Sequence, residues 1–253
     1  MAVSFDPVTG IYDATRWSGV PPEIMKKLLN TMKELFTGCR AILDVGIGTG
    51  RFAEYLNDSG LNIVGVDVSL SMMAKAREKR LRNLVRADAH HLPFRDTAFD
   101  GAIMIHVLHL VRDWVQVVGE VGRVTRKIVV AEVEGGEGFN PRQRYLELRQ
   151  EMGYPLDRFN DGEVGLRRVL PPETVRTVGD YLTDVDVHEE IDSFDKRKSS
   201  VSWDVPAAIN DRIIQRLHSE NPERKVRRRE IVEVVGWDPA QLQNVTDRGS
   251  SGT

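Results

Sequence analysis

Strand-like and helix-like patterns alternate along residues 21–134 of the chain. Short apolar runs that are typical of buried strands occur at 41–46, 62–68, 84–88, 99–106 and 127–134. Around them, apolar positions recur at helical spacing in 21–37, 51–58, 69–82 and 113–125. Strands that alternate with helices build a parallel sheet with helices on both faces. The pattern therefore predicts an α/β fold.

The pattern changes after Glu134, where glycines follow at 135, 136 and 138. An arginine-rich amphipathic stretch covers 140–168, and the run Pro171-Pro172-Glu173 predicts the start of a new helix. The alternating run DVDVHEEI predicts a strand within 183–203.

Two further elements and a tail complete the prediction. We expect a helix at 206–219 and a last strand at 228–235. The residues after Trp237 are polar and small, so we predict that 238–253 is a disordered tail.

Composition excludes several classes of protein. The net charge of −3 provides no general basic field for nucleic acid or an anionic membrane. Cys39 is the one cysteine, so neither an intrachain disulfide nor a cysteine zinc site is expected. The first ten residues lack the layout of a signal peptide, and no apolar run is long enough to span a membrane. These features predict a cytoplasmic protein. We expect it to be a monomer or a dimer.

Residues 44–50 read Asp-Val-Gly-Ile-Gly-Thr-Gly, between a predicted strand and a predicted helix. Glycines at such a turn allow a sharp bend and a close approach of ligand to backbone. Alone, the loop is a weak signal, because such turns bind many nucleotides and some are only tight structural turns. Two acids narrow the choice, because Asp67 and Asp88 end the next two predicted strands. At that edge of a sheet, Asp67 can accept from ribose hydroxyls and Asp88 from an adenine amino group.

A dinucleotide such as NAD is the rival ligand for this loop. In the G-x-G-x-x-G pattern of dinucleotide sites the third glycine would fall on Arg51. Asp44 would also face a pyrophosphate at close range, which is unfavourable. S-adenosylmethionine (SAM) has an ammonium group and a sulfonium and lacks phosphate. The acidic loop therefore favours SAM.

The runs LDVGIGTGRFAEYL, VGVDVSLSMMAKAR and VRADAHHLPFRDTAFDGAIMIHVLHLVRDW resemble class I SAM-dependent methyltransferases. The likeness is greatest to the small-molecule branch that includes ubiquinone/menaquinone C-methyltransferase-like proteins. It implies a Rossmann-like, seven-stranded, mostly parallel sheet with helices on both faces and an antiparallel last strand. It also implies one domain over 1–237, with helical cap segments at about 136–170 and 206–219.

The resemblance also implies roles for individual residues. The loop that meets the methionine part of SAM would contain Asp44, Gly46, Ile47 and Gly48. Asp67 would bind the ribose, with Val68 next to it over the adenine, while Asp88 and Ala89 would meet the adenine edge. The remaining cofactor candidates are His106, through its backbone, and Arg16.

Methyl transfer needs a base only when the acceptor's nucleophile carries a proton. The candidates for this role are His106 and His109, with Tyr12 as a further catalytic candidate from the segment GIYDATRW. The alternative is that His109 packs against the next helix and His106 contributes backbone alone. No metal site is predicted, because the adjacent His90 and His91 point apart and no third ligand is evident.

The acceptor is predicted to be a small molecule, and S-adenosyl-L-homocysteine (SAH) is the expected product. Two alternatives stay open, an RNA or protein methyltransferase and a SAM-binding protein without transferase activity. The sequence HVLH after the fourth strand lacks the Asn/Asp-Pro-Pro-aromatic motif of adenine and glutamine methylation. The basic run 224–229 leads into a predicted strand without aromatic partners, which favours a solvated strand over an RNA site.

Overall fold

A computed structural model describes residues 20–156, 162–196 and 198–245 of the protein. The chain divides into two compact units. The first comprises 1–134, 158–179 and 232–253, and the second comprises 135–157 and 180–231.

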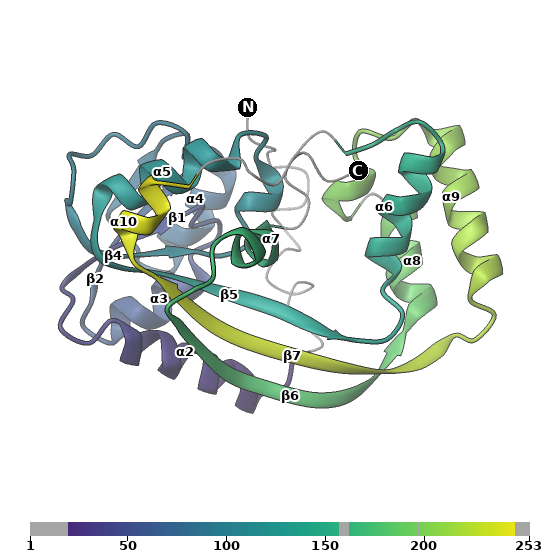
Figure 1. Cartoon of the computed structure of the whole chain (residues 1–253), viewed down its shortest axis with the longest axis horizontal. Helices are drawn as coiled ribbons and strands as arrows, with labels where there is room; N and C mark the ends of the chain where they lie inside the picture. Colours follow the sequence, from purple (N-terminus) through teal and green to yellow (C-terminus); the bar gives the residue numbers. More distant parts are fainter. Residues whose placement is uncertain (1–19, 157–161, 197, 246–253) are drawn as a thin grey trace. The chain divides into compact units, whose positions relative to one another are not determined.

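The described strands form one seven-stranded sheet in the order β3-β2-β1-β4-β5-β7-β6 (Figure 1). Neighbouring strands from β3 to β5 are parallel. The strands are β1 (Ala41–Val45), β2 (Asn62–Asp67), β3 (Leu84–Arg86), β4 (Phe99–Met104), β5 (Thr125–Glu137), β6 (Thr174–Asp186) and β7 (Lys225–Trp237).

The last strand, β7, runs antiparallel to both of its neighbours. Gly236 of β7 lies against Ile128 of β5, and Arg229 of β7 lies against Gly136 of β5. Residue numbers therefore rise along β5 in the direction in which they fall along β7. At the two ends of β6, the Glu173 N–H donates to the Gly236 carbonyl and the Val187 N–H donates to the Arg224 carbonyl, which is again an antiparallel pattern. The predicted fold class, including the antiparallel last strand, is confirmed.

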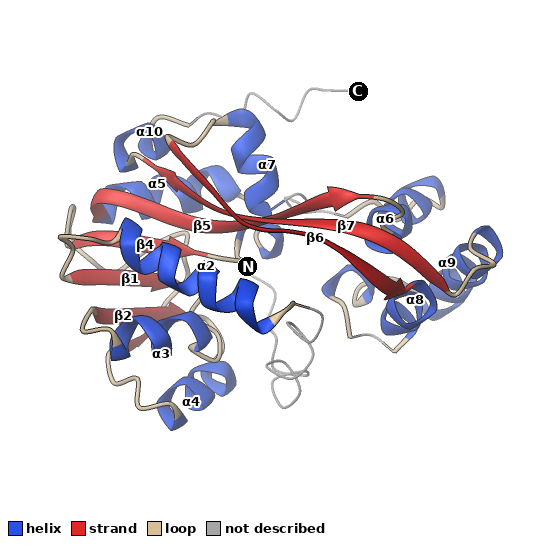
Figure 2. Cartoon of the chain, turned by 90° about the horizontal axis from the view of Figure 1, so that it is seen from below, coloured by secondary structure: helices blue, strands red, loops and turns tan. Residues whose placement is uncertain are grey.

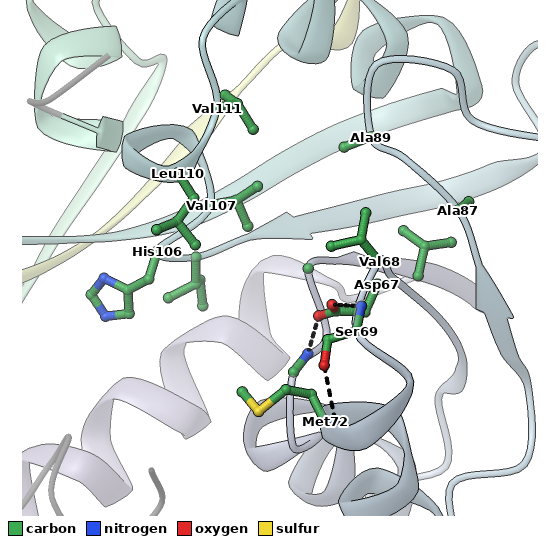
Figure 3. Close-up of a pocket in the computed structure, with 14 residues that line it drawn as sticks. Asp67, Val68, Ser69, Met72, Ala87, Ala89, His106, Val107, Leu110 and Val111 are labelled. Carbon is green, nitrogen blue, oxygen red and sulfur yellow. Dashed lines mark hydrogen bonds between the residues drawn. The ribbon is translucent and has the colours of Figure 1, made fainter. Parts of the chain in front are cut away.

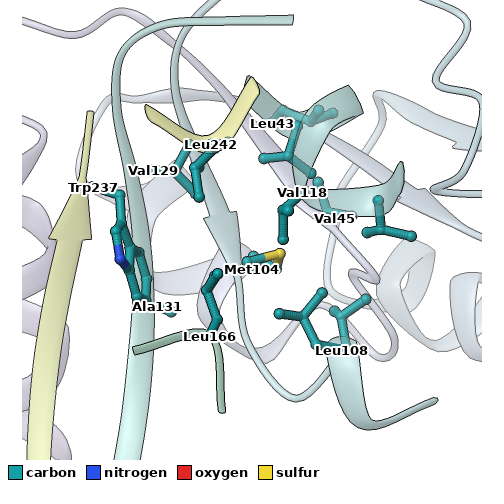
Figure 4. Close-up of a cluster of buried hydrophobic side chains, with 14 of the residues drawn as sticks. Leu43, Val45, Met104, Leu108, Val118, Val129, Ala131, Leu166, Trp237 and Leu242 are labelled. Carbon is teal, nitrogen blue, oxygen red and sulfur yellow. The ribbon is translucent and has the colours of Figure 1, made fainter. Parts of the chain in front are cut away.

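Helices cover both faces of the sheet in the first unit, with α2 and α3 on one face and α5 and α10 on the other (Figure 2). Apolar residues from the sheet pack against α5 and α10 in one core, which includes Met104, Val118, Val129, Trp237 and Leu242 (Figure 4). The helices are α2 (Pro22–Leu35), α3 (Arg51–Asp58), α4 (Leu70–Glu78), α5 (Trp114–Val124), α7 (Gly162–Val169) and α10 (Pro239–Gln243), with the short turn η2 (Leu108–Leu110).

The second unit has its own core, formed where α6 (Pro141–Glu151), α8 (Val187–Asp195) and α9 (Ala207–Glu220) pack together. Its buried residues include Tyr145, Ile191, Phe194, Ile213 and Leu217. The Tyr145 hydroxyl bonds to the Asn210 side chain at 2.5 Å, which satisfies two polar groups inside this core.

Arg149 of α6 is buried in the second unit, with only 2% of the residue exposed. Its guanidinium donates to the carbonyls of Tyr154, Pro155 and Val201 and to both carboxylate oxygens of Asp204. One side chain therefore holds the end of α6 to the turn η3 (Ser200–Ser202).

Three segments differ from the sequence-based predictions. The run after Pro171-Pro172 forms the strand β6 instead of a helix, because its residues pair with β7. The residues Val187–Asp195 form α8 instead of a strand, since Val187, Ile191 and Phe194 recur at helical spacing and are buried. The run 239–243 forms α10 within the predicted disordered tail, because Leu242 is buried in the core. Residues 246–253 lie outside the described residues.

The two segments predicted as a cap are helical where they are described. Segment 136–170 contains α6, in the second unit, and α7, in the first unit. Segment 206–219 coincides with α9, in the second unit. Their role as a cap on a single domain stays a prediction. Within the described residues, no helix is both long enough and apolar enough to cross a membrane.

Candidate functional site

The glycine loop follows β1 and turns sharply into α3. Gly46, Gly48 and Gly50 all have positive φ, at 69°, 55° and 76°, a conformation that glycine adopts without strain. The N–H groups of Gly46 and Ile47 both donate to the Val66 carbonyl at 2.9 Å, which fastens the loop to β2. A Cβ atom on Gly46 would lie 2.6 Å from a Val107 methyl carbon. The loop is therefore packed against the segment that follows β4.

Asp67, at the end of β2, joins the glycine loop to the start of α4. One carboxylate oxygen accepts from the Gly48 N–H and the other from the Ser69 N–H, both at 2.8 Å. Each carboxylate oxygen has two lone pairs and can accept more than one hydrogen bond. The Ser69 side chain caps α4 by accepting from the Met72 N–H.

Asp44 lies in β1 beneath the loop, and only 6% of the residue is exposed. Burial, together with the charge of Asp67, raises the pKa of Asp44 to about 8. The carboxyl is therefore largely protonated at neutral pH in the absence of a cation. A positive ligand group near it would favour the ionised form.

A pocket opens at the carboxyl ends of β1, β2, β3 and β4 (Figure 3). Asp67 lies on one side of it and His106 on another, with apolar side chains between. None of its fourteen described lining residues is a lysine or an arginine. They are Gly46, Gly48, Val66, Asp67, Val68, Ser69, Met72, Ala87, Ala89, Ile105, His106, Val107, Leu110 and Val111.

Most cofactor candidates from the sequence lie at this pocket, but Asp44, Ile47 and Asp88 are not among its lining residues. The side chain of Ile47 packs against Gly65 of β2. Burial opposes ionisation of Asp88, but hydrogen bonds from the His90 N–H and ring more than offset it and lower the pKa of Asp88. Tyr12 and Arg16 lie outside the described residues.

His106 follows β4 with a φ of 56°, which is uncommon for a residue with a side chain. Its Nε2 lies 3.2 Å from a carboxylate oxygen of Glu132 in β5, a residue with a fully buried side chain. The ring of His109 lies 6.3 Å from that of His106, edge to face. His106 lines the pocket, and His109 is not among the lining residues.

The loop after β4 is held by Glu163, a buried residue in the first turn of α7. One oxygen of Glu163 accepts from the N–H groups of Val107, at 2.8 Å, and Leu108, at 3.2 Å. Sequence reasoning missed Glu163 and Glu132, because each meets its partner across a long separation along the chain. It also missed the apolar pocket residues Ile105, Leu110 and Val111, which have no distinguishing motif.

The donor atoms of His106, Glu132 and Glu134 lie within 4.8 Å of one another. One imidazole and two carboxylates at this spacing are a donor set that a divalent cation accepts. The same arrangement is what an imidazole base with an acidic partner requires. The two possibilities are separated by experiment below.

Comparison with known proteins identifies the family. A model described as a methyltransferase domain matches residues 43–129. An uncharacterized methyltransferase of Mycobacterium tuberculosis is 30% identical over 182 residues, which cover 70% of this chain and 68% of that protein. The chain belongs to the class I methyltransferases.

Other similar proteins agree with this family. The demethylmenaquinone methyltransferase of Renibacterium salmoninarum is 33% identical over 138 residues, and the match spans only 58% of its length. The structure of a SAM-dependent methyltransferase, possible histamine N-methyltransferase, from Thermotoga maritima is 18% identical with a TM-score of 0.50. That match covers 92% of this chain and 99% of the other. It shows the fold of this methyltransferase and nothing finer.

Replacing Gly46 by alanine is expected to disrupt the loop of this methyltransferase. The positive φ costs about 1–2 kcal/mol with a side chain, and the new Cβ would meet Val107 at 2.6 Å. We expect SAH affinity, measured by calorimetry, to fall roughly tenfold or more. Gly60→Ala is the matched control, because its φ is 88° but nothing lies within 4 Å of its Cβ. Equal SAH affinity in both variants would contradict the close packing of the loop.

Proposed function

We propose that the protein transfers a methyl group from SAM to a small-molecule acceptor and releases SAH. The observation that carries this proposal is the acidic pocket at the glycine loop. Asp67 lines it, Asp44 lies beneath it, and none of its described lining residues is a lysine or an arginine. Such a pocket suits a ligand with an ammonium and a sulfonium and opposes a pyrophosphate.

The residues present fit the parts of SAM. Asp67 lines the pocket at the end of β2, where a carboxylate can accept from ribose hydroxyls, and Gly46 and Gly48 line it where the methionine part would lie. Val68 and Ala89 supply apolar walls for the adenine. When bound, SAM supplies a methyl group made electrophilic by its sulfonium, and the surrounding residues hold an acceptor in line with it.

The ion pairs that the arginines of the basic run 224–229 form favour a small acceptor over RNA. Three of its arginines pair with acids in the second unit. Arg224 pairs with Asp186, Arg228 with Glu190 and Glu230, and Arg229 with Asp180. Arginines engaged in this way offer less charge to a phosphate backbone.

We also propose that the protein is located in the cytoplasm and is a monomer or a dimer.

Calorimetric titration with SAH and with NAD tests the choice of cofactor. We expect SAH to bind with a dissociation constant in the low-micromolar range or below, and NAD to give no heat of binding at the same concentrations. The acidic pocket is the reason for this difference. NAD binding without SAH binding would overturn the proposal.

Asp67→Ala is expected to weaken SAH binding by about 1–3 kcal/mol, because the ribose hydroxyls lose a charged acceptor. The variant also loses the bonds to Gly48 and Ser69, so we expect some loss of thermal stability. Asp67→Asn is the control, since its amide oxygen can still accept from one of the two N–H groups. A lower melting temperature with unchanged SAH affinity would assign Asp67 a structural role alone.

A further inference from the structure

A buried carboxylate lies beside the imidazole at the pocket. Glu132 is in β5, which pairs in parallel with β4 so that Ile103 lies opposite Val130. This register brings the residues just after β4 level with Glu132. The Glu132 oxygen and His106 Nε2 are 3.2 Å apart, and the Glu132 side chain has no exposed surface.

Placing a carboxylate here is costly for the fold. The side chain is fully buried, and a buried carboxylate is unfavourable unless a positive group or hydrogen bonds compensate it. An imidazole at 3.2 Å can compensate the carboxylate when the ring is protonated. A buried carboxylate beside an imidazole at a ligand pocket indicates a functional role.

His106 stands where a base for methyl transfer is needed. It lines the same pocket as Gly46 and Gly48, and it lies on a different side from Asp67 (Figure 3). In the sheet, β1 with its glycine loop lies between β2, which ends at Asp67, and β4, which precedes His106. The left-handed backbone at His106 and the bonds from Glu163 to the next two N–H groups fix the position of this segment.

We propose that Glu132 is a positioning residue that holds His106 as the base of methyl transfer. It follows that the acceptor presents a nucleophile that carries a proton, either a hydroxyl or an ammonium group. The inference rests on the proposed function. Nε2 is the ring nitrogen that lies 3.2 Å from Glu132, and we assign the uptake of the acceptor's proton to Nδ1.

The step balances without any further reactant. The acceptor's oxygen or nitrogen forms a bond to the methyl carbon, and the electron pair of the broken sulfur–methyl bond stays on sulfur as a thioether. A hydroxyl gives its proton to Nδ1 of His106 as the bond forms, whereas an ammonium group gives its proton to Nδ1 first, because its nitrogen has no lone pair until then. A positive charge on sulfur is thus replaced by one on the imidazole, where the Glu132 carboxylate stabilises it.

Other titratable groups also face this segment. Glu134 follows on the same strand and has a carboxylate oxygen within 4.8 Å of the His106 ring nitrogen. His109 lies in η2, and Glu163 lies in α7. Glu134 is exposed, unlike Glu132, so its charge is screened by water. Glu134→Gln is therefore the matched control for Glu132→Gln.

Nitrogen NMR of the ¹⁵N-histidine-labelled full chain, saturated with SAH, tests the proposal without an acceptor. In the wild type we expect neutral His106 to carry its proton on Nε2 and to titrate above the ordinary value of about 6.5. In Glu132→Gln the pKa of His106 is expected to fall by roughly one pH unit or more, and in Glu134→Gln by clearly less. A Glu132 that supports packing without acting on the imidazole would leave this titration unchanged.

Several results would overturn the proposal. These are a proton on Nδ1 in the neutral form, an equal pKa of His106 in the wild type and Glu132→Gln, or a pKa at or below the ordinary value. The wild-type results alone decide the matter if Glu132→Gln does not fold.

Broadening of His106 signals by equimolar Mn²⁺, abolished in Glu132→Gln, would assign His106, Glu132 and Glu134 to a metal site instead. Failure of the wild type to bind SAH would reject the proposed function, whereas SAH binding with an unresponsive His106 would reject this inference alone.

Discussion

The cofactor-free protein is expected to lose stability as the pH rises from 5 to 8, and Asp44→Asn is expected to remove much of this loss. The pKa of Asp44 is about 8 in the folded chain and near 3.8 in the unfolded chain. Between these values the folded state keeps a proton that the unfolded state releases, so the free energy of unfolding falls with pH. The contribution over these three pH units is about 4 kcal/mol. Urea unfolding of both proteins at pH 5 and pH 8 measures it.

Asp100→Asn is the control for the Asp44 experiment. Asp100 is also a buried aspartate, but the Arg126 side chain and the Arg40 and Ala41 N–H groups lower its pKa to about 2. It is ionised in both folded and unfolded chains from pH 5 to 8. We therefore expect Asp100→Asn to be less stable at every pH and to keep the wild-type slope. The same slope in Asp44→Asn would contradict a protonated Asp44.

Arg149→Met is expected to destabilise the second unit by about 3–5 kcal/mol. The substitution removes the guanidinium donors to the carbonyls of Tyr154, Pro155 and Val201 and to Asp204. Methionine fills much of the same volume, so the loss reports hydrogen bonds more than an empty cavity. Hydrogen exchange of α6, α8 and α9 measures the local effect, and urea unfolding measures the total.

Arg144→Met on the same helix is the control for Arg149. Arg144 pairs with Glu147, Glu151 and Glu220 at a partly exposed position. Such pairs contribute little, so we expect a change within about 1 kcal/mol. Equal losses in the two variants would show that the burial of Arg149 is not what makes its bonds important.

The sequence predicted the strands and helices of 21–134 well because their apolar runs are buried on both faces of a parallel sheet. It failed at β6, where the edge position leaves Val175 and Leu182 exposed and the pattern weak. At α8, neighbouring Val185 and Val187 suggested alternation, although the residues that pack are spaced as in a helix. A single apolar anchor, Leu242, orders α10 within an otherwise polar run.

The site also contains residues that the sequence indicated and residues that it did not. Gly46, Gly48 and Asp67 follow one another within a short stretch of chain, so their spacing indicated a ligand. Glu132 and Glu163 meet the β4 loop through tertiary packing, and each looks in sequence like any other acidic residue. Asp44 and Asp67 were both expected to face the ligand, but their different burial became evident only in the folded chain.

The strand order also constrains how the chain folds during synthesis. β7 lies between β5 and β6, yet it leaves the ribosome after both of them. Until it arrives, β6 lacks its neighbour in the sheet, and the core of the first unit lacks Trp237 and Leu242. The edge of β5 stays open for pairing over the same interval. The nascent chain therefore completes its sheet by inserting its last strand between two earlier ones, and chaperones that cover the β5 edge would act in that interval.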